Sequence, residues 1–211
     1  MLNQTTLEHL RTLKLDGMAR GLEEQRQLPA FQDLGFEDRL GILVDRERHW
    51  RDDRRLKRLL KAAKLKHADA CLEDVDYSAN RGLQKSVIAG LTSNDWIRQG
   101  QSILLTGPTG AGKTYIACAL GNKACREGLT VRYWRAPRLF QELALAKGDG
   151  RHPKLLRDIA KADLLILDDW ATALLTDEQR RDLFDIVEDR YERRATLIAA
   201  QVPLEHWHQT I

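Results

Sequence analysis

The chain has 211 residues, of which 43% are hydrophobic and 31% are charged, and its formal net charge is +3, which indicates a globular, water-soluble protein. No apolar run approaches the roughly 20 residues of a membrane-spanning helix, and the first residues lack the basic start and apolar core of a signal peptide. The three cysteines form no CxxC pair, which favours a reducing cytoplasm over secretion.

The first 70 residues are predicted to be helical. Apolar residues recur at helical spacing over 6–27, and a second helix is expected from Phe36 onward. That helix leads into a basic segment, residues 46–66, which holds ten Lys/Arg against three Asp/Glu and keeps four apolar residues at helical spacing. We therefore expect an amphipathic helix with one basic face.

A basic face attracts the phosphates of nucleic acid, whereas the competing interpretation is a solvated face that only aids solubility. The excess of positive charge favours DNA contact, and a membrane-surface helix is disfavoured because the apolar face is narrow. A second candidate is the loop 148–154, for which a plain helix–helix connector is the alternative. The candidate DNA-binding residues are Arg51, Arg54, Arg55, Arg58, Lys61, Lys64, Arg151 and Lys154.

From about residue 101 the pattern changes to alternating strands and helices, which predicts a parallel sheet with right-handed crossovers. The predicted strands are 102–106, 130–134, 163–168 and 196–200. A helix with a capping box, in which Thr176 caps and Gln179 reaches back, is predicted before the last strand. Its predicted apolar stripe is Leu183, Phe184, Val187 and Tyr191. We expect two domains, a helical one over 1–72 and an α/β one over 73–211.

The first predicted strand, 102–106, is expected to be buried. The segment that follows it, residues 107–114, fits the phosphate-binding loop pattern G-x-x-x-x-G-K-[ST] at every fixed position. Its glycines allow successive backbone N–H groups to turn toward phosphates, and the helix that follows adds the positive end of its dipole. Lys113 is expected to reach the β- and γ-phosphates of ATP, and the Thr114 hydroxyl to ligate Mg²⁺. The candidate ATP-binding residues are Gly107, Pro108, Thr109, Gly110, Ala111, Gly112, Lys113 and Thr114.

A continuous apolar run over 164–167 predicts a central strand, and it ends in two carboxylates. Asp168 is expected to hold Mg²⁺, directly or through water, and Asp169 to orient or deprotonate the attacking water. Gln201 leaves the following strand, where it could sense the γ-phosphate or position water. The alternative for Gln201 is an ordinary polar residue at a strand end.

The segments 104–114, 165–170, 176–182 and 201–208 resemble the IstB-like ATP-binding proteins of insertion sequences, and the resemblance covers essentially the whole chain. That family belongs to the AAA+ ATPases and is close to the DnaC-type helicase loaders. The resemblance implies a P-loop sheet of order 5-1-4-3-2 and an ATPase that forms oligomers on double-stranded DNA. It also implies that this ATPase deforms target DNA and stimulates a transposase.

Two departures from the family pattern concern hydrolysis. AAA+ proteins more often have Glu at the position of Asp169, so slow turnover or help from a neighbouring subunit is expected. Family members continue past the segment matching 205–208 with strand 5, an arginine finger and a lid, and we expect these parts to be missing. The alternatives are a replicative helicase loader and a DNA scaffold that binds ATP with negligible hydrolysis. A small-molecule kinase is disfavoured because no Arg-rich lid follows Asp169.

Overall fold

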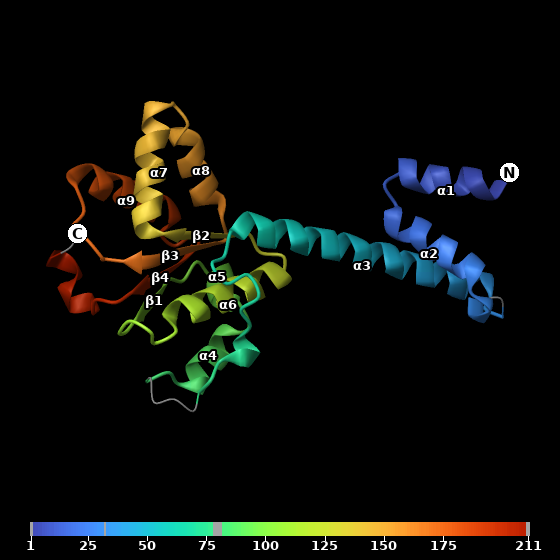
Figure 1. Cartoon of the computed structure of the whole chain (residues 1–211), viewed down its shortest axis with the longest axis horizontal. Helices are drawn as coiled ribbons and strands as arrows, with labels where there is room; N and C mark the ends of the chain where they lie inside the picture. The colour runs from blue at the N-terminus through green and yellow to red at the C-terminus, as the bar shows by residue number, and fades with distance from the viewer. Residues whose placement is uncertain (1, 32, 78–81, 210–211) are drawn as a thin grey trace. The chain divides into compact units, whose positions relative to one another are not determined.

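The computed structural model describes residues 2–31, 33–77 and 82–209 (Figure 1). Contacts divide the chain into two units, Met1–Arg58 and Leu59–Ile211, which are described separately. Residues 59–72, which the sequence pattern groups with the N-terminal helices, make hydrogen bonds within the second unit: Arg132 donates to the carbonyl of Ala62 (2.6 Å) and Asn122 to that of Ala68 (2.5 Å). Among the described helices, none is both long and apolar enough to cross a membrane.

The first unit is helical, as predicted. The stretch expected to be one helix is two, α1 (Leu2–Thr12) and α2 (Asp16–Gln27), and the 3-10 turn η1 (Pro29–Phe31) follows. The chain breaks between α1 and α2 because Lys14 has a left-handed backbone with φ of 59°. The helix predicted from Phe36 is confirmed as α3 (Phe36–Ala63), whose 28 residues include most of the basic segment.

The N-terminal end of α2 packs on α3 through a buried carboxylate. Glu47 is 7% exposed, and its Oε2 accepts the backbone N–H groups of Gly17 (2.8 Å) and Met18 (3.1 Å). A carboxylate at this position complements the positive end of the helix dipole. The approach is so close that a Cβ on Gly17 would lie 2.7 Å from the carbonyl oxygen of Arg46. Glycine is therefore required at this helix crossing.

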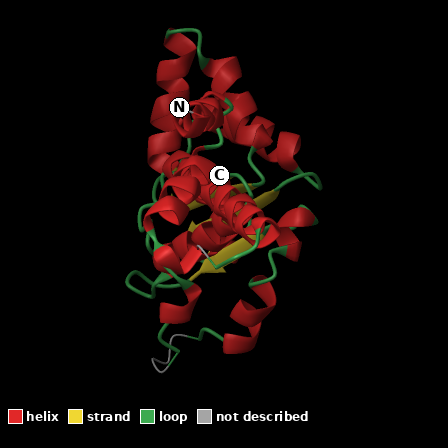
Figure 2. Ribbon diagram, turned by 90° about the vertical axis from the view of Figure 1, so that its right-hand side faces the viewer, coloured by secondary structure: helices red, strands yellow, loops and turns green. Residues whose placement is uncertain are grey.

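The second unit contains a four-stranded parallel sheet with order β1-β4-β3-β2. Its strands are drawn in yellow in Figure 2, among the red helices. This topology confirms the predicted strand–helix alternation and the 1-4-3-2 part of the predicted order. No strand among the described residues lies at the position predicted for strand 5, beside β1. The elements are η2 (Leu72–Asp74), α4 (Lys85–Leu91), α5 (Asp95–Arg98), β1 (Ile103–Thr106), α6 (Lys113–Arg126), β2 (Val131–Arg135), α7 (Ala136–Gly148), α8 (His152–Lys161), β3 (Leu164–Trp170), α9 (Asp177–Arg190), β4 (Ala195–Ala200) and η3 (Leu204–Gln209).

The sheet has helices on both faces, with α7, α8 and α9 on one side and α5 and α6 on the other (Figure 1). Side chains alternate along β3, so Leu165 and Leu167 pack with the first group of helices, whereas Ile166 contacts Gly121 of α6. All four residues 164–167 are buried, which confirms the predicted central strand. The strand before the phosphate loop is less buried than predicted, since Leu104 of β1 is 44% exposed.

The buried face of α9 differs from the predicted stripe. The capping box at its start is confirmed, and Leu183 is buried, but Phe184, Val187 and Tyr191 are 65%, 45% and 69% exposed. The core side instead carries Asp182, Leu183, Ile186 and Arg190. The prediction was wrong because it followed apolar residues alone, and two residues of the buried face, Asp182 and Arg190, are charged.

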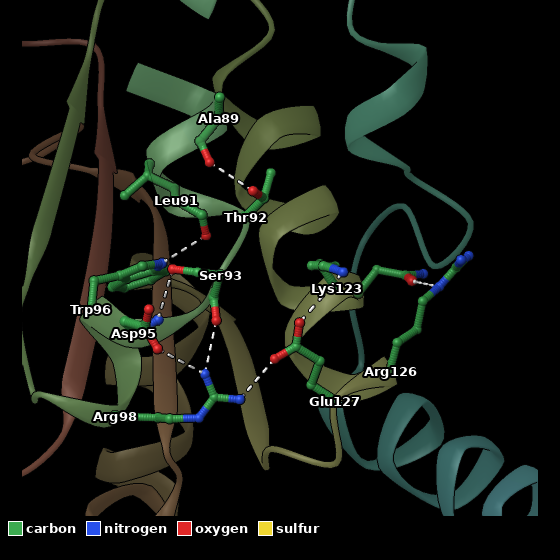
Figure 3. A network of polar contacts seen from close by, with 11 residues as sticks. Ala89, Leu91, Thr92, Ser93, Asp95, Trp96, Arg98, Lys123, Arg126 and Glu127 are labelled. Carbon is green, nitrogen blue, oxygen red and sulfur yellow. Dashed lines mark hydrogen bonds and ion pairs between the residues drawn. The ribbon is translucent and has the colours of Figure 1, made fainter. Parts of the chain in front are cut away.

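The segment that leads into β1 is fastened to the C-terminal end of α6 (Figure 3). Arg98 donates to Glu127 Oε2 (2.8 Å) and to the carbonyl of Ser93 (2.8 Å), and the Trp96 indole donates to the carbonyl of Leu91 (3.2 Å). Because α6 begins at the phosphate-loop lysine, this network fixes the strand before the loop relative to the helix after it.

Candidate functional site

The candidate phosphate loop occupies residues 107–112, between the end of β1 and the start of α6. Gly110 and Gly112 have φ of 81° and 92°, a left-handed backbone that residues with a Cβ rarely adopt. The first backbone N–H groups of α6 have no carbonyl partner within the helix and point toward the loop, where the helix dipole is positive. This is the local geometry that binds a phosphate group.

Polar side chains converge on this loop from two other positions. The Lys113 ammonium donates to the carbonyl oxygens of Gly107 (2.6 Å) and Pro108 (2.8 Å). Thr109 donates to Gln201 Oε1 (2.8 Å), which follows the C-terminal end of β4. The structure therefore brings Gln201 to the loop, as expected from parallel strands whose carboxyl ends share one edge of the sheet.

The two predicted carboxylates point to different partners. Asp168 is 2% exposed, and its Oδ2 accepts the Thr114 hydroxyl at 2.8 Å. Asp169 lies at an irregularity in the β3–β4 pairing and has φ of 54°. Its Oδ2 accepts the guanidinium Nε of Arg135 at 2.5 Å. The two adjacent carboxylates thus have separate environments, one buried beside the loop and the other paired with a cation.

Sequence reasoning missed two residues of β2 that complete this arrangement. The Tyr133 hydroxyl donates to Asp168 Oδ2 at 2.7 Å, and Arg135 binds Asp169. Burial and the bond to Asp168 raise the pKa of Tyr133 far above its usual value, and the bond to Asp169 raises the pKa of Arg135. Tyr133 is therefore a neutral donor and Arg135 a cation. The one signal of Tyr133 and Arg135 in the sequence is their spacing. They are two residues apart on one strand, so their side chains are expected on the same face of the sheet.

The donor set suits nucleotide-bound magnesium. A Thr hydroxyl and an Asp carboxylate, 2.8 Å apart, are the hard oxygen groups that Mg²⁺ prefers. Within the described ranges no group of three or more His, Cys, Asp and Glu residues could hold a metal ion. A protein site with few ligands fits Mg²⁺, which is commonly held by one or two carboxylates together with substrate phosphates.

The candidate DNA-binding residues belong to two segments of the chain, α3 with the residue that follows it and the connection between α7 and α8. On α3, Arg51 pairs with Glu47 (2.6 Å) and Arg54 with Asp16 (3.4 Å), while Arg58 is exposed. Also exposed are Arg55, Lys61 and Lys64.

The second segment is the connection between α7 and α8. Arg151 forms ion pairs with Asp149 (2.7 Å) and Glu142 (3.2 Å), which offset its charge. The loop predicted over 148–154 is shorter than expected, because α8 begins at His152 and places Lys154 in its first turn.

The fold and this site define the class of the protein. A phosphate loop follows the first strand, β3 carries two adjacent carboxylates, and β4 lies between β1 and β3, which is the arrangement of an AAA+ type P-loop domain. The DnaC helicase loader has a similar fold, with a TM-score of 0.56 and 26% identity over 64% of this chain and 78% of that one. DnaI has a TM-score of 0.58 at 22% identity, over 68% of this chain and 78% of its own.

The chain belongs to the IstB-like ATP-binding proteins, whose family model matches residues 8–211. A protein of Pseudomonas fluorescens, named for ATP binding in insertion sequence IS1162, is 53% identical over 96% of this chain and 88% of its own length. An insertion-sequence protein of Sinorhizobium fredii, also named for ATP binding, is 46% identical over all of this chain and 86% of its own. The predicted family and fold class are thereby confirmed.

Proposed function

We propose that this protein is an ATP-dependent, DNA-binding helper of a transposase. In this proposal it binds ATP with Mg²⁺, assembles with further copies on double-stranded target DNA, deforms that DNA and stimulates transposition. The observation that carries the proposal is the contact between Thr114 of the phosphate loop and Asp168 of β3. It joins the two halves of a nucleotide site in a chain whose relatives are named for insertion sequences.

The residues of the site have separate roles in this proposal. The loop 107–112 and the first turn of α6 hold the phosphates through backbone N–H groups, and Lys113 supplies a positive charge. Thr114 and Asp168 would hold Mg²⁺, which neutralises charge that develops on the phosphates. Asp169 orients the attacking water and accepts its proton, and Gln201 positions that water or contacts the γ-phosphate. Asp169 must first exchange its bond to Arg135 for one to water.

ATP turnover tests the enzymatic part. We expect phosphate release by the wild-type protein with Mg²⁺, stimulated by double-stranded DNA, and its loss in Lys113→Ala. Lys123→Ala is the matched control, because it removes the same charge from an outer position of the same helix. Tight ATP binding without turnover, with and without DNA, would instead support an ATP-binding scaffold.

The basic face of α3 is the proposed DNA contact, and its salt dependence tests it. Each phosphate contact contributes about 0.9 to the slope of log K against log salt. The Arg55→Ala/Arg58→Ala variant is therefore expected to show weaker binding to mixed-sequence duplex DNA and a slope shallower by about 1.8. The control is Arg11→Ala/Arg193→Ala, which removes the same charge from exposed positions outside the basic segment. An unchanged slope in the first variant would refute this assignment.

A replicative helicase loader is the second candidate, because the fold is similar to that of the DnaC helicase loader. The relatives named for insertion sequences favour the transposition role. Adding the purified protein to a strand-transfer assay, and separately to a helicase-loading assay, distinguishes the two. Stimulation of helicase loading alone would overturn the transposition proposal.

A further inference from the structure

The hydroxyl of Tyr133 is buried against the carboxylate that the proposed function assigns to magnesium. We propose that Tyr133 is a positioning residue: its hydroxyl fixes the orientation of Asp168, so that the carboxylate is ready for nucleotide-bound magnesium. This inference rests on the proposed function and extends the site to β2, a strand from which the phosphate-loop motif takes no residue.

Strand register places the tyrosine at this point. Tyr133 of β2 pairs with Ile166 of β3, and paired residues of parallel strands point to the same face of the sheet. Asp168 is the next residue of β3 on that face, which is the face covered by α6. The tyrosine side chain is long enough to extend along the sheet to the carboxylate, and it does so at 2.7 Å.

Both described hydrogen bonds to the Asp168 side chain end on one oxygen. Oδ2 accepts Tyr133 from β2 and Thr114 from α6, so donors on two different elements hold it. Oδ1 of Asp168 accepts no hydrogen bond from the part of the chain that the structure describes. Rotation of the carboxylate would break both hydrogen bonds. The two donors, Tyr133 and Thr114, therefore fix which oxygen of Asp168 faces a ligand at the loop.

The two donors are not equivalent in the proposed site. Thr114 is itself a proposed magnesium ligand, so the position of its oxygen would have to suit the ion as well as Asp168. Tyr133 is 8% exposed and is not a proposed magnesium ligand. Its hydroxyl is therefore the donor whose position depends on Asp168 and the protein core alone. Groups that orient a metal ligand in this way typically alter metal affinity by about 10- to 100-fold when removed.

The competing interpretation is a core tyrosine whose hydroxyl merely finds a partner, since buried hydroxyl groups without one are costly. The two interpretations differ in what the hydroxyl affects. A packing role influences stability with or without magnesium. A positioning role influences the step in which magnesium strengthens nucleotide binding.

Tyr133→Phe removes the hydroxyl and keeps the ring. The probe is a fluorescent ATP analogue, titrated into the full-length protein in EDTA and over a series of Mg²⁺ concentrations, with thermal unfolding recorded in EDTA. We expect unchanged affinity in EDTA and about a tenfold rise, or more, in the Mg²⁺ concentration for half-maximal binding. Tyr191→Phe is the matched control, because it removes a hydroxyl from a residue that is 69% exposed.

Each other result overturns the inference in a distinguishable way. Wild-type magnesium dependence in Tyr133→Phe refutes the positioning role and leaves the proposed function intact, provided that Lys113→Ala still loses binding. A variant that unfolds, or that loses binding equally in EDTA and in Mg²⁺, assigns the hydroxyl to core packing. Failure of the wild-type protein to bind the analogue, or to respond to Mg²⁺, overturns the proposed function and the positioning role together.

Discussion

Replacing Arg190 by Met is expected to destabilise the second unit without weakening its nucleotide site. Arg190 is 1% exposed, and its guanidinium donates to the carbonyls of Ile159 (2.7 Å), Ala162 (2.8 Å) and Ala195, and to the Thr196 hydroxyl (3.1 Å). One side chain of α9 thereby joins the end of α8 to the beginning of β4. Methionine fills similar space but donates no hydrogen bond.

The size of the effect follows from two opposing contributions. Three backbone carbonyls lose a buried donor, and each such loss costs about 1–3 kcal/mol. In the opposite direction, burial lowers the pKa of Arg190 to about 10. At about 1.4 kcal/mol per pKa unit, removal of the buried charge returns roughly 3 kcal/mol. The expected net loss is about 3 kcal/mol, or roughly 10 °C in Tm for a unit of this size.

Thermal and guanidinium-induced unfolding, followed by circular dichroism, measures this loss. The control is Arg193→Met, an exposed position where a change of less than about 0.5 kcal/mol is expected. Nucleotide affinity at 20 °C should stay within about twofold, because Arg190 acts at the starts of β3 and β4 and the site lies at their ends. Equal stabilities of the two variants would refute this reasoning, and so would a large loss of affinity in the folded Arg190→Met protein.

Three further predictions concern other parts of the chain. Gly17→Ala should destabilise the helical unit by about 1–3 kcal/mol, because the new Cβ would lie 2.7 Å from the backbone of α3. Gly41→Ala adds its Cβ in open space and should stabilise the unit by about 0.5–1 kcal/mol. Urea unfolding measures both changes in the free energy of unfolding. Arg135→Ala should raise ATP turnover in the absence of DNA severalfold, because it frees Asp169 from its ion pair; a fall in turnover would contradict this. Thr176→Ala should cost about 1 kcal/mol in thermal unfolding by removing the capping box.

Local signals in the sequence predicted the elements of the site that depend on contiguous residues. The phosphate-loop motif is eight consecutive residues, 107–114, and its glycines determine the backbone geometry of the loop, so its place between a strand and a helix could be predicted. The run 164–167 is apolar throughout because both faces of β3 are covered, and that pattern marks a central strand. Gln201 could be placed near the loop because all parallel strands end at one edge of the sheet.

The parts that could not be predicted depend on charged or hydroxyl-bearing side chains with partners far along the chain. Arg190 and Asp182 lie on the buried side of α9, where a hydrophobic pattern assigns charged residues to solvent. Asp182 is paired with Lys147 of α7 at 2.7 Å, and Arg190 is satisfied by backbone carbonyls. The exposed stripe Phe184, Val187 and Tyr191 has the correct helical period, so periodicity alone could not choose between the two faces.

The contribution of β2 shows why the complete site requires the strand register. Tyr133 and Arg135 precede Asp168 and Asp169 by more than thirty residues, and no motif joins them. Once β2 is paired with β3, both reach the carboxylate strand, and each binds a different carboxylate. Tyr133 is neutral and buried, so it can hold Asp168 permanently, whereas Arg135 is 53% exposed and its pair with Asp169 can open. In the proposed function, the same strand therefore supplies a fixed contact to the carboxylate assigned to magnesium and a releasable one to the carboxylate assigned to the attacking water.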